Sequence, residues 1–168
     1  MTTAAPAGPR LRLERVGLAR ARALIAGDYS EVDPAPGWPH DDTMDGMRME
    51  AAHAETDEQT GFLAILVETG QVIGEAGWKG GPDLDGVAEI GYGIAAPSRG
   101  QGLGTELVGL LTAWVHAQPG VTQVVAEVLP GNLPSLRALE RNGFTLLEPP
   151  AGTTPTVRLV YRPQPSSL

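Results

Sequence analysis

The chain has 168 residues, a formal net charge of −8 and no cysteine. This length predicts a single domain that buries enough apolar surface to fold without disulfide or metal staples. The acidic balance excludes nonspecific binding to nucleic acid or to an anionic membrane, and the lack of cysteine excludes thiolate metal sites. No apolar run approaches the roughly 20 residues that span a bilayer, and the first residues do not resemble a secretory signal, so we expect a cytoplasmic protein.

The amino-terminal part is predicted to form an edge strand and a helix. Leu11 and Leu13 alternate with charged residues, which is typical of a strand with one buried face. Apolar residues then follow helical spacing from about residue 18 to 25, and Gly27 is expected to end that helix. Three prolines make residues 33–39 a loop.

A second helix is expected from about residue 41 to residue 56. Its buried face is predicted from apolar residues at three- and four-residue steps, which are Met44, Met47, Ala51 and Ala54. This spacing leaves Glu50, His53 and Asp57 outside the buried face.

The rest of the chain alternates between β-rich runs and helical patterns. Strands are predicted at 62–67, 71–78, 87–95, 121–129, 144–147 and 156–161, and helices at 103–117 and 132–142. The element order is therefore β-α-α-β-β-β-α-β-α-β-β. We expect an α/β (α+β) fold, with a mixed, mostly antiparallel sheet of six or seven strands and about four helices. One domain is predicted over residues 10–163, between disordered tails at 1–9 and 164–168.

The segment from Glu89 to Gly104 carries the clearest chemical signal. A strand runs into a turn with alternate glycines, and an amphipathic helix follows at once. The start of a helix offers unpaired N–H groups and partial positive charge, which favour a phosphate or pyrophosphate, and Arg99 can add charge. The alternative is a turn that only reverses the chain. Nucleotide fingerprints fit poorly, because the only lysine is Lys79 and Thr105 stands where a third fingerprint glycine would be.

These residues resemble the GNAT superfamily of N-acetyltransferases. Arg99-Gly-Gln-Gly-Leu-Gly104 is similar to its R/Q-x-x-G-x-G/A motif, and Asn132-Leu-Pro-Ser135 with Gly143-Phe144 is similar to the RimJ/RimL branch. The resemblance implies direct transfer of an acetyl group from acetyl-CoA to a primary amine, on a cationic small molecule or a protein N-terminus, without a metal. An alternative is a non-catalytic acetyl-CoA-binding sensor or interaction module of the same fold, and a weaker one is a nucleotide-binding protein. Homodimers also occur in this family.

The resemblance also implies a coenzyme site. Backbone amides of the glycine turn would bind the pyrophosphate, and the pantetheine arm would lie where the strand around Tyr92 splays from the strand at 122–128. A main-chain amide near Gly93 or Ile94 would polarise the thioester carbonyl. The implied coenzyme-binding residues are Tyr92, Gly93, Ile94, Ala95, Arg99, Gly100, Gln101, Gly102, Leu103, Gly104, Thr105, Asn132 and Ser135. Asn132 is equally suited to capping the helix that follows it.

Two residues are candidates for catalysis. Glu89 is expected to take the proton of the amine, directly or through water, because strand alternation places it on one face with two glycines. Its alternative is a salt bridge at the sheet edge. Ser135 is expected to donate a hydrogen bond to the leaving thiolate, or to be only a helix residue, because Leu139 occupies the slot of the family's tyrosine. Tyr92 is a further candidate acid or a wall residue.

The acceptor side is expected between residues 28 and 58. This segment holds ten acidic residues and one basic residue, Arg48. An acidic rim would attract a cationic amine, although the alternative is a solvated acidic surface. The candidate acceptor-binding residues are Trp38, Asp41, Asp42, Glu50 and His53. Trp38 would stack on the ligand or pin its loop, and His40 and His53 are alternative bases. No metal-ligand spacing is present.

Overall fold

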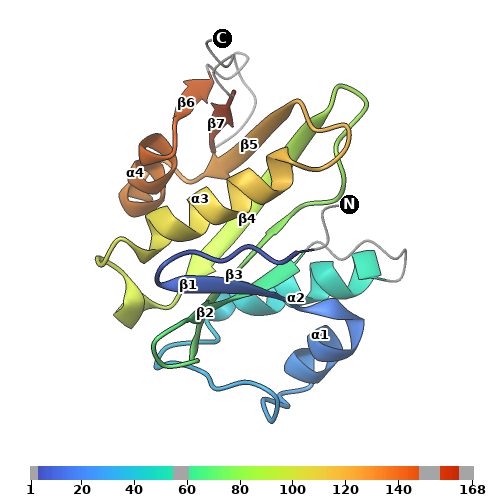
Figure 1. Cartoon of the computed structure of the whole chain (residues 1–168), viewed down its shortest axis with the longest axis vertical. Helices are drawn as coiled ribbons and strands as arrows, with labels where there is room; N and C mark the ends of the chain where they lie inside the picture. Colours follow the sequence, from blue (N-terminus) through green and yellow to red (C-terminus); the bar gives the residue numbers. More distant parts are fainter. Residues whose placement is uncertain (1–3, 55–60, 148–155, 163–168) are drawn as a thin grey trace.

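A single seven-stranded sheet runs through the centre of the molecule (Figure 1). The computed structural model describes residues 4–54, 61–147 and 156–162. The strands follow the spatial order β1-β2-β3-β4-β5-β7-β6, and only β4 and β5 run parallel to each other. Their bounds are β1 Leu11–Arg15, β2 Gly61–Leu66, β3 Val72–Trp78, β4 Val87–Ile94, β5 Gln123–Val128, β6 Phe144–Leu147 and β7 Val157–Tyr161.

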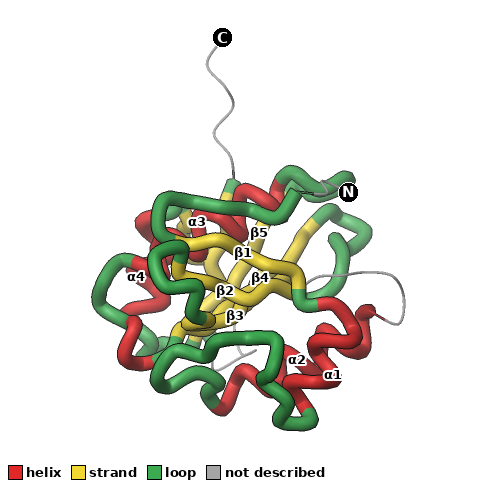
Figure 2. Tube along the Cα trace, turned by 60° about the horizontal axis from the view of Figure 1, so that its bottom comes forward, coloured by secondary structure: helices red, strands yellow, loops and turns green. Residues whose placement is uncertain are grey.

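Four α-helices cover the two faces of the sheet. They are α1 Gly17–Ile25, α2 Asp41–Ala54, α3 Leu103–His116 and α4 Leu133–Arg141, and a short 3₁₀ helix, η1, spans Ala96–Ser98. Figure 2 shows α1 and α2 together on one side of the sheet and α3 on the other. The expected fold class and element order are confirmed, and η1 is the only helix of the described residues that the sequence did not predict.

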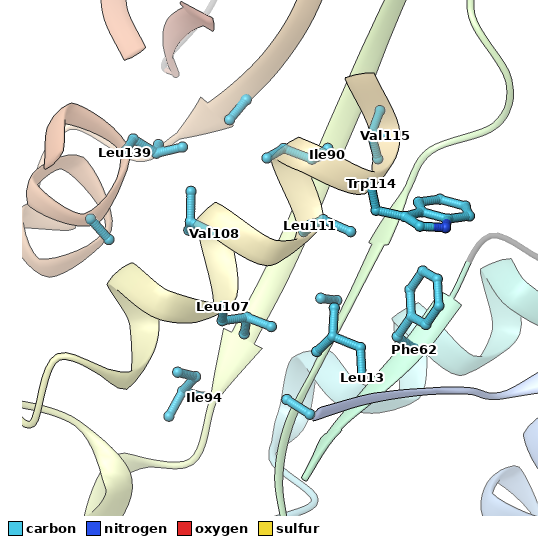
Figure 3. Close-up of a cluster of buried hydrophobic side chains, with 14 of the residues drawn as sticks. Leu13, Phe62, Ile90, Ile94, Leu107, Val108, Leu111, Trp114, Val115 and Leu139 are labelled. Carbon is cyan, nitrogen blue, oxygen red and sulfur yellow. The ribbon is translucent and has the colours of Figure 1, made fainter. Parts of the chain in front are cut away.

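The larger core lies between the sheet and α3. Leu107 and Leu111 of α3 are fully buried and belong to one cluster with Ile90 and Ile94 of β4 (Figure 3). The aromatic rings of Phe62 and Trp114 meet edge to face, with centroids 4.9 Å apart. This packing fixes the start of α3 against the end of β4.

The second core lies under α1 and α2. The face of α2 that it buries differs from the expected one. Met47 is buried as predicted, but Thr43 and Glu50 are also buried on that helix. Residues 43, 47 and 50 are one and two turns apart, so they share a face. The expectation that Glu50 lies outside the buried face was therefore wrong. Periodicity of apolar residues alone did not reveal it, because the buried positions include polar residues.

The amino-terminal segment is also more ordered than expected. The amide of Gly8 donates to the carbonyl of Leu11, at 2.7 Å, and the amide of Leu13 donates to that of Pro6, at 2.8 Å. The predicted disordered tail over residues 1–9 is therefore wrong for residues 6–8, which fold back on β1. The predicted tail at 164–168 lies outside the described residues. Within the described part of the chain, no helix is long and apolar enough to cross a membrane.

Candidate functional site

The sheet opens where β4 and β5 part. Parallel pairing joins Val87–Ile90 to Gln123–Ala126, but β4 continues to Ile94 and β5 to Val128. β4 stays paired with β3 over this whole stretch. The main-chain groups of 91–94 that face β5 are therefore left without a strand partner. Buried backbone groups need partners, so this gap suits an extended ligand that hydrogen-bonds like a strand.

A row of free amides follows at the end of β4. Gly100 and Gly102 have φ values of 76° and 78°, which glycine adopts without strain, and Gly102 is the N-cap of α3. Among the described residues, no hydrogen bond is found from the amides of residues 100–105. These donors and the positive end of the helix dipole converge on one place, so they can hold a phosphate or diphosphate.

Arg10 and Glu106 tie this loop to β1. Glu106 accepts hydrogen bonds from the amides of Arg10 and Leu11, both at 2.9 Å, and from Nε of Arg10, also at 2.9 Å. Burial opposes ionisation of Glu106, but these three donors outweigh it and lower its pKa. Nη1 of Arg10 donates to the carbonyl of Gln101 at 2.7 Å. The sequence analysis missed Arg10 as a cation beside the loop, because no local pattern links it to a turn 91 residues away.

Arg99 has a structural contact of its own. Its Nε donates to the carbonyl of Ile94 at 2.9 Å, so the side chain folds back across the end of β4. The side chain of Arg99 therefore stays close to the glycine loop, and its Nε is already bonded to the backbone.

The start of α4 faces the same opening. Oδ1 of Asn132 accepts from the amide of Ser135 at 3.3 Å, so Asn132 caps α4. The hydroxyls of Ser135 and Tyr92 share a hydrogen bond of 2.6 Å between α4 and β4. Burial raises the pKa of the Tyr92 hydroxyl, and the bond with Ser135 offsets only part of that effect. Leu139 is fully buried in the core.

A cavity of about 240 Å³ lies between α2 and the sheet. Its floor includes Gly61, Gly77 and Gly91, which face one another across β2, β3 and β4. Because residues directly opposite each other share a face, three missing side chains leave this space open. Met47 and Met49 of α2 supply apolar walls, and Phe62, Trp78 and Tyr92 border the space next to the three glycines. We call this space the acceptor cavity.

The acceptor cavity carries more acidic than basic side chains. Asp42, Asp45, Glu50 and Glu75 line it, and Lys79 is the one basic residue in its lining. Nζ of Lys79 donates to Oε1 of Glu89 at 2.5 Å. Glu89 thus has the salt bridge that was the alternative to a catalytic role, while it remains on the cavity side of β4 and partly exposed.

A buried carboxylate, Glu75, organises one end of the acceptor cavity. Its Oε2 accepts from Nε1 of Trp38 at 2.8 Å and from the hydroxyl of Thr43 at 2.9 Å. Its Oε1 lies 3.0 Å from Nε2 of His40, at ion-pair distance but without the alignment of a linear hydrogen bond. The contact with Glu75 raises the pKa of His40, although burial opposes the shift.

The structure separates the predicted acceptor residues. Asp42 and Glu50 line the cavity, whereas Asp41 is exposed and does not. Trp38 is 4% exposed and bonded to Glu75, which favours the second of its two expected roles, that of pinning its loop. The side chain of His53 lies outside the described residues. Sequence analysis missed Glu75, although a charged residue inside an otherwise apolar run was a usable signal.

Metal ligation has no support from the described side chains, which contain no group of three His, Cys, Asp or Glu residues that could hold an ion. The groups that converge at the opening are instead backbone amides, hydroxyls and one imidazole–carboxylate pair.

Comparison with known proteins supplies the family. The family model described as an acetyltransferase (GNAT) domain matches residues 10–145. The uncharacterized N-acetyltransferase YjdG of Bacillus subtilis is 23% identical over 146 residues, which cover 82% of this chain and 87% of that protein. An acetyltransferase structure from Agrobacterium tumefaciens has a TM-score of 0.67 and 25% identity, covering 97% of this chain and 96% of that one. The ribosomal alpha-N-protein acetyltransferase RimL, solved with coenzyme A, has a TM-score of 0.64 at 16% identity and covers 94% of this chain and 96% of its own.

Proposed function

The chain belongs to the GNAT family of acetyltransferases, and from this premise we propose that it transfers an acetyl group from acetyl-CoA directly to the primary amine of a cationic acceptor. The observation that carries the proposal is the continuity of the β4–β5 gap with the free amides of residues 100–105. In coenzyme A an extended pantetheine arm is joined to a diphosphate, and the gap and the row of amides match these two neighbouring groups in kind and in order. The solved RimL complex, which contains coenzyme A, agrees with this assignment.

The coenzyme would be held mainly by main-chain groups. The amides at the start of α3 would bind its diphosphate, and the unpaired edge of β4 near Gly93 and Ile94 would bind the pantetheine and polarise the thioester carbonyl. Attack on that carbonyl builds negative charge on oxygen, which a preorganised amide stabilises. The chain has no cysteine, the most natural nucleophile to carry an acyl group, and we assign a direct passage of the acetyl group to the amine.

The amine would enter the acceptor cavity. Its carboxylates favour an ammonium group, and its apolar walls favour a short hydrocarbon stem. This combination supports a cationic amine, either a small molecule or a peptide N-terminus with neighbouring positive charge.

Proton transfer would use groups on both sides of β4. Glu89 lies on the same face of β4 as Gly91 of the cavity floor, and we assign it the uptake of the released proton through water. Ser135, bonded to Tyr92, would donate to the leaving thiolate of coenzyme A. A thiol with a reference pKa of about 8.5 leaves readily as a thiolate when such a donor is present.

A thiol-release assay with acetyl-CoA tests the proposal. The panel comprises spermidine, an aminoglycoside, lysine and a basic peptide with a free N-terminus, with mass spectrometry of the products. We expect release of one thiol for each acetylated amine. Binding of acetyl-CoA without release on any amine would favour the sensor module, and binding of ATP or NAD in its place would favour a nucleotide-binding protein.

A further inference from the structure

Glu75, which lines the acceptor cavity, contacts His40, and the reaction outlined above uses neither residue of this titratable pair. Glu75 comes from β3 and His40 from the residue before α2. A Cβ atom at Gly93 would lie 2.5 Å from Oε1 of Glu75 and 2.7 Å from Cε1 of His40. Both side chains therefore lie directly over Gly93, the position whose amide is expected to face the thioester carbonyl.

The surroundings fix this pair in place. Both donors to Oε2 of Glu75 are buried, so that oxygen is fully engaged and Oε1 is left for His40. The backbone of His40 is held by Thr43, whose hydroxyl accepts from the amide of His40 at 3.1 Å. With Nε2 facing Glu75, the ring nitrogen that points the other way is Nδ1, for which the described residues provide no hydrogen-bond partner.

Distance along the strand separates His40 from Glu89. Gly93 lies four residues after Glu89, which corresponds to about 13 Å in an extended strand. Glu89 is also bonded to Lys79. A carboxylate in that position reaches the region of Gly93 only through several waters, whereas the imidazole of His40 already lies there.

We propose that His40, positioned by Glu75, is the group that takes the proton from the acceptor amine at the reacting carbon. This role rests on the proposed function. The ammonium nitrogen loses one proton to Nδ1 of His40, its lone pair forms the bond to the thioester carbon, and the carbon–sulfur bond breaks. The second proton lost by nitrogen neutralises the thiolate, and the proton on His40 leaves through water past Glu89.

Charge favours this transfer. With a neutral imidazole the pair carries one negative charge, which attracts an ammonium, and after transfer it is a neutral ion pair beside a neutral amine. Before the transfer, the positive charge is on the ammonium and the negative charge is on Glu75. After the transfer, both charges lie in the His40–Glu75 pair, where the carboxylate stabilises the imidazolium. Glu75 is accordingly a positioning residue.

The charged groups around His40 set the sign of the pH dependence. Glu75 from β3 and Asp42 from α2 raise the pKa of His40, whereas Arg99, beyond η1, lowers it, and the net direction is upward. His40 accepts a proton only when it is neutral. The rate should therefore rise with pH, with a midpoint above 6.5, the ordinary value for histidine.

The test measures kcat from about pH 5 to pH 9 with acetyl-CoA and the best amine of the panel. We expect H40Q to lose roughly 100-fold in kcat together with the rise between acid and neutral pH. E75Q should move that rise to lower pH, because the carboxylate no longer favours the imidazolium. E89Q should lower the plateau and leave the midpoint in place. His116, on α3 against Tyr161, supplies the matched control H116Q, which should behave like the parent.

Two further measurements separate catalysis from structure. Added imidazole should restore part of the activity of H40A, which a purely structural role of His40 would not allow. The imidazole signal of His40, assigned from H40Q, should titrate above 6.5 in the parent and move down in E75Q without any amine present. Parental kcat and midpoint in H40Q would overturn the role of His40. Absence of turnover in the parent would instead overturn the proposed function, and the role of His40 with it.

Discussion

At the scale of single residues, the site depends on charges whose partners come from distant parts of the chain. Glu89 was predicted from strand alternation, and it is a partly exposed residue on the face of β4 that carries Gly91. Its partner Lys79 lies opposite it on the neighbouring chain segment, where the amide of Lys79 donates to the carbonyl of Glu89 at 2.7 Å. Glu75 and His40 are 35 positions apart in the sequence, and no local pattern predicts that they pair.

Replacing Glu89 with glutamine tests its part in proton release. We expect kcat to fall by roughly 10- to 100-fold while the Kd for acetyl-CoA, measured by calorimetry, stays unchanged, because Glu89 lies on the face of β4 that carries Gly91 and not in the coenzyme loop. Glu14 on β1, which pairs with Arg12 at 2.6 Å and Arg20 at 2.7 Å, gives the control E14Q. Equal kcat in the parent and E89Q would remove Glu89 from the reaction.

Titration of His40 should also make the stability of the folded protein depend on pH. Because its folded pKa is raised above 6.5, protonation favours the folded state. That contribution is fully present below pH 6.5 and is lost as the pH rises through the folded pKa. We therefore expect the Tm of the parent to fall relative to that of H40Q as the pH increases across this window, in thermal melts without ligand. Parallel curves would contradict a raised pKa at His40.

At the scale of elements, the sequence predicted each strand and α-helix of the described residues within two residues of its bounds in the structure. Hydrophobic periodicity and capping residues act locally, so they can be read from a single chain. The glycine turn before α3 was predicted for the same reason. The face of α2 was not, because the cavity beneath it accepts polar side chains such as Glu50 and Thr43 where a helix normally buries apolar ones.

The loop before α3 can be tested with a pair of glycines. Gly100 and Gly70 both have a φ of 76°, and no atom lies within 4 Å of a Cβ built at either position. Alanine should therefore cost each turn about 1–2 kcal/mol through backbone strain alone. Only G100A should also weaken acetyl-CoA binding, by roughly tenfold as measured by calorimetry, because relief of the strain moves one amide of the loop out of hydrogen-bond reach of the diphosphate. Equal affinities in the two variants would remove the loop from the coenzyme site.

The glycine floor of the acceptor cavity makes a separate prediction. A Cβ at Gly91 would meet only Cε of Lys79, at 3.5 Å, so G91A should fold normally. The added methyl group would occupy the cavity, and we expect a raised KM for the amine with an unchanged Kd for acetyl-CoA. Gly81, where nothing lies within 4 Å, provides the control G81A. An unchanged KM in G91A would place the acceptor elsewhere.

At the scale of the whole molecule, the two sides of β4 present different chemical groups. The α3 side presents amides and a helix N-terminus, as the proposal requires for an anionic coenzyme, whereas the α2 side presents carboxylates, as it requires for a cationic acceptor. The net charge of −8 is distributed unevenly along the chain, with the acidic residues concentrated between 28 and 58, which agrees with the proposed cationic acceptor. Composition predicted this asymmetry, but only the fold shows that β4 separates the two sides at Gly93.

The measurement that tests this account most directly is an amide NMR titration of the parent protein with acetyl-CoA. The account predicts that the amide signals of residues 100–105 shift first and most, followed by those of Gly93 and Ile94, and that pyrophosphate alone shifts only the former set. Binding that leaves the signals of residues 100–105 unmoved would contradict it.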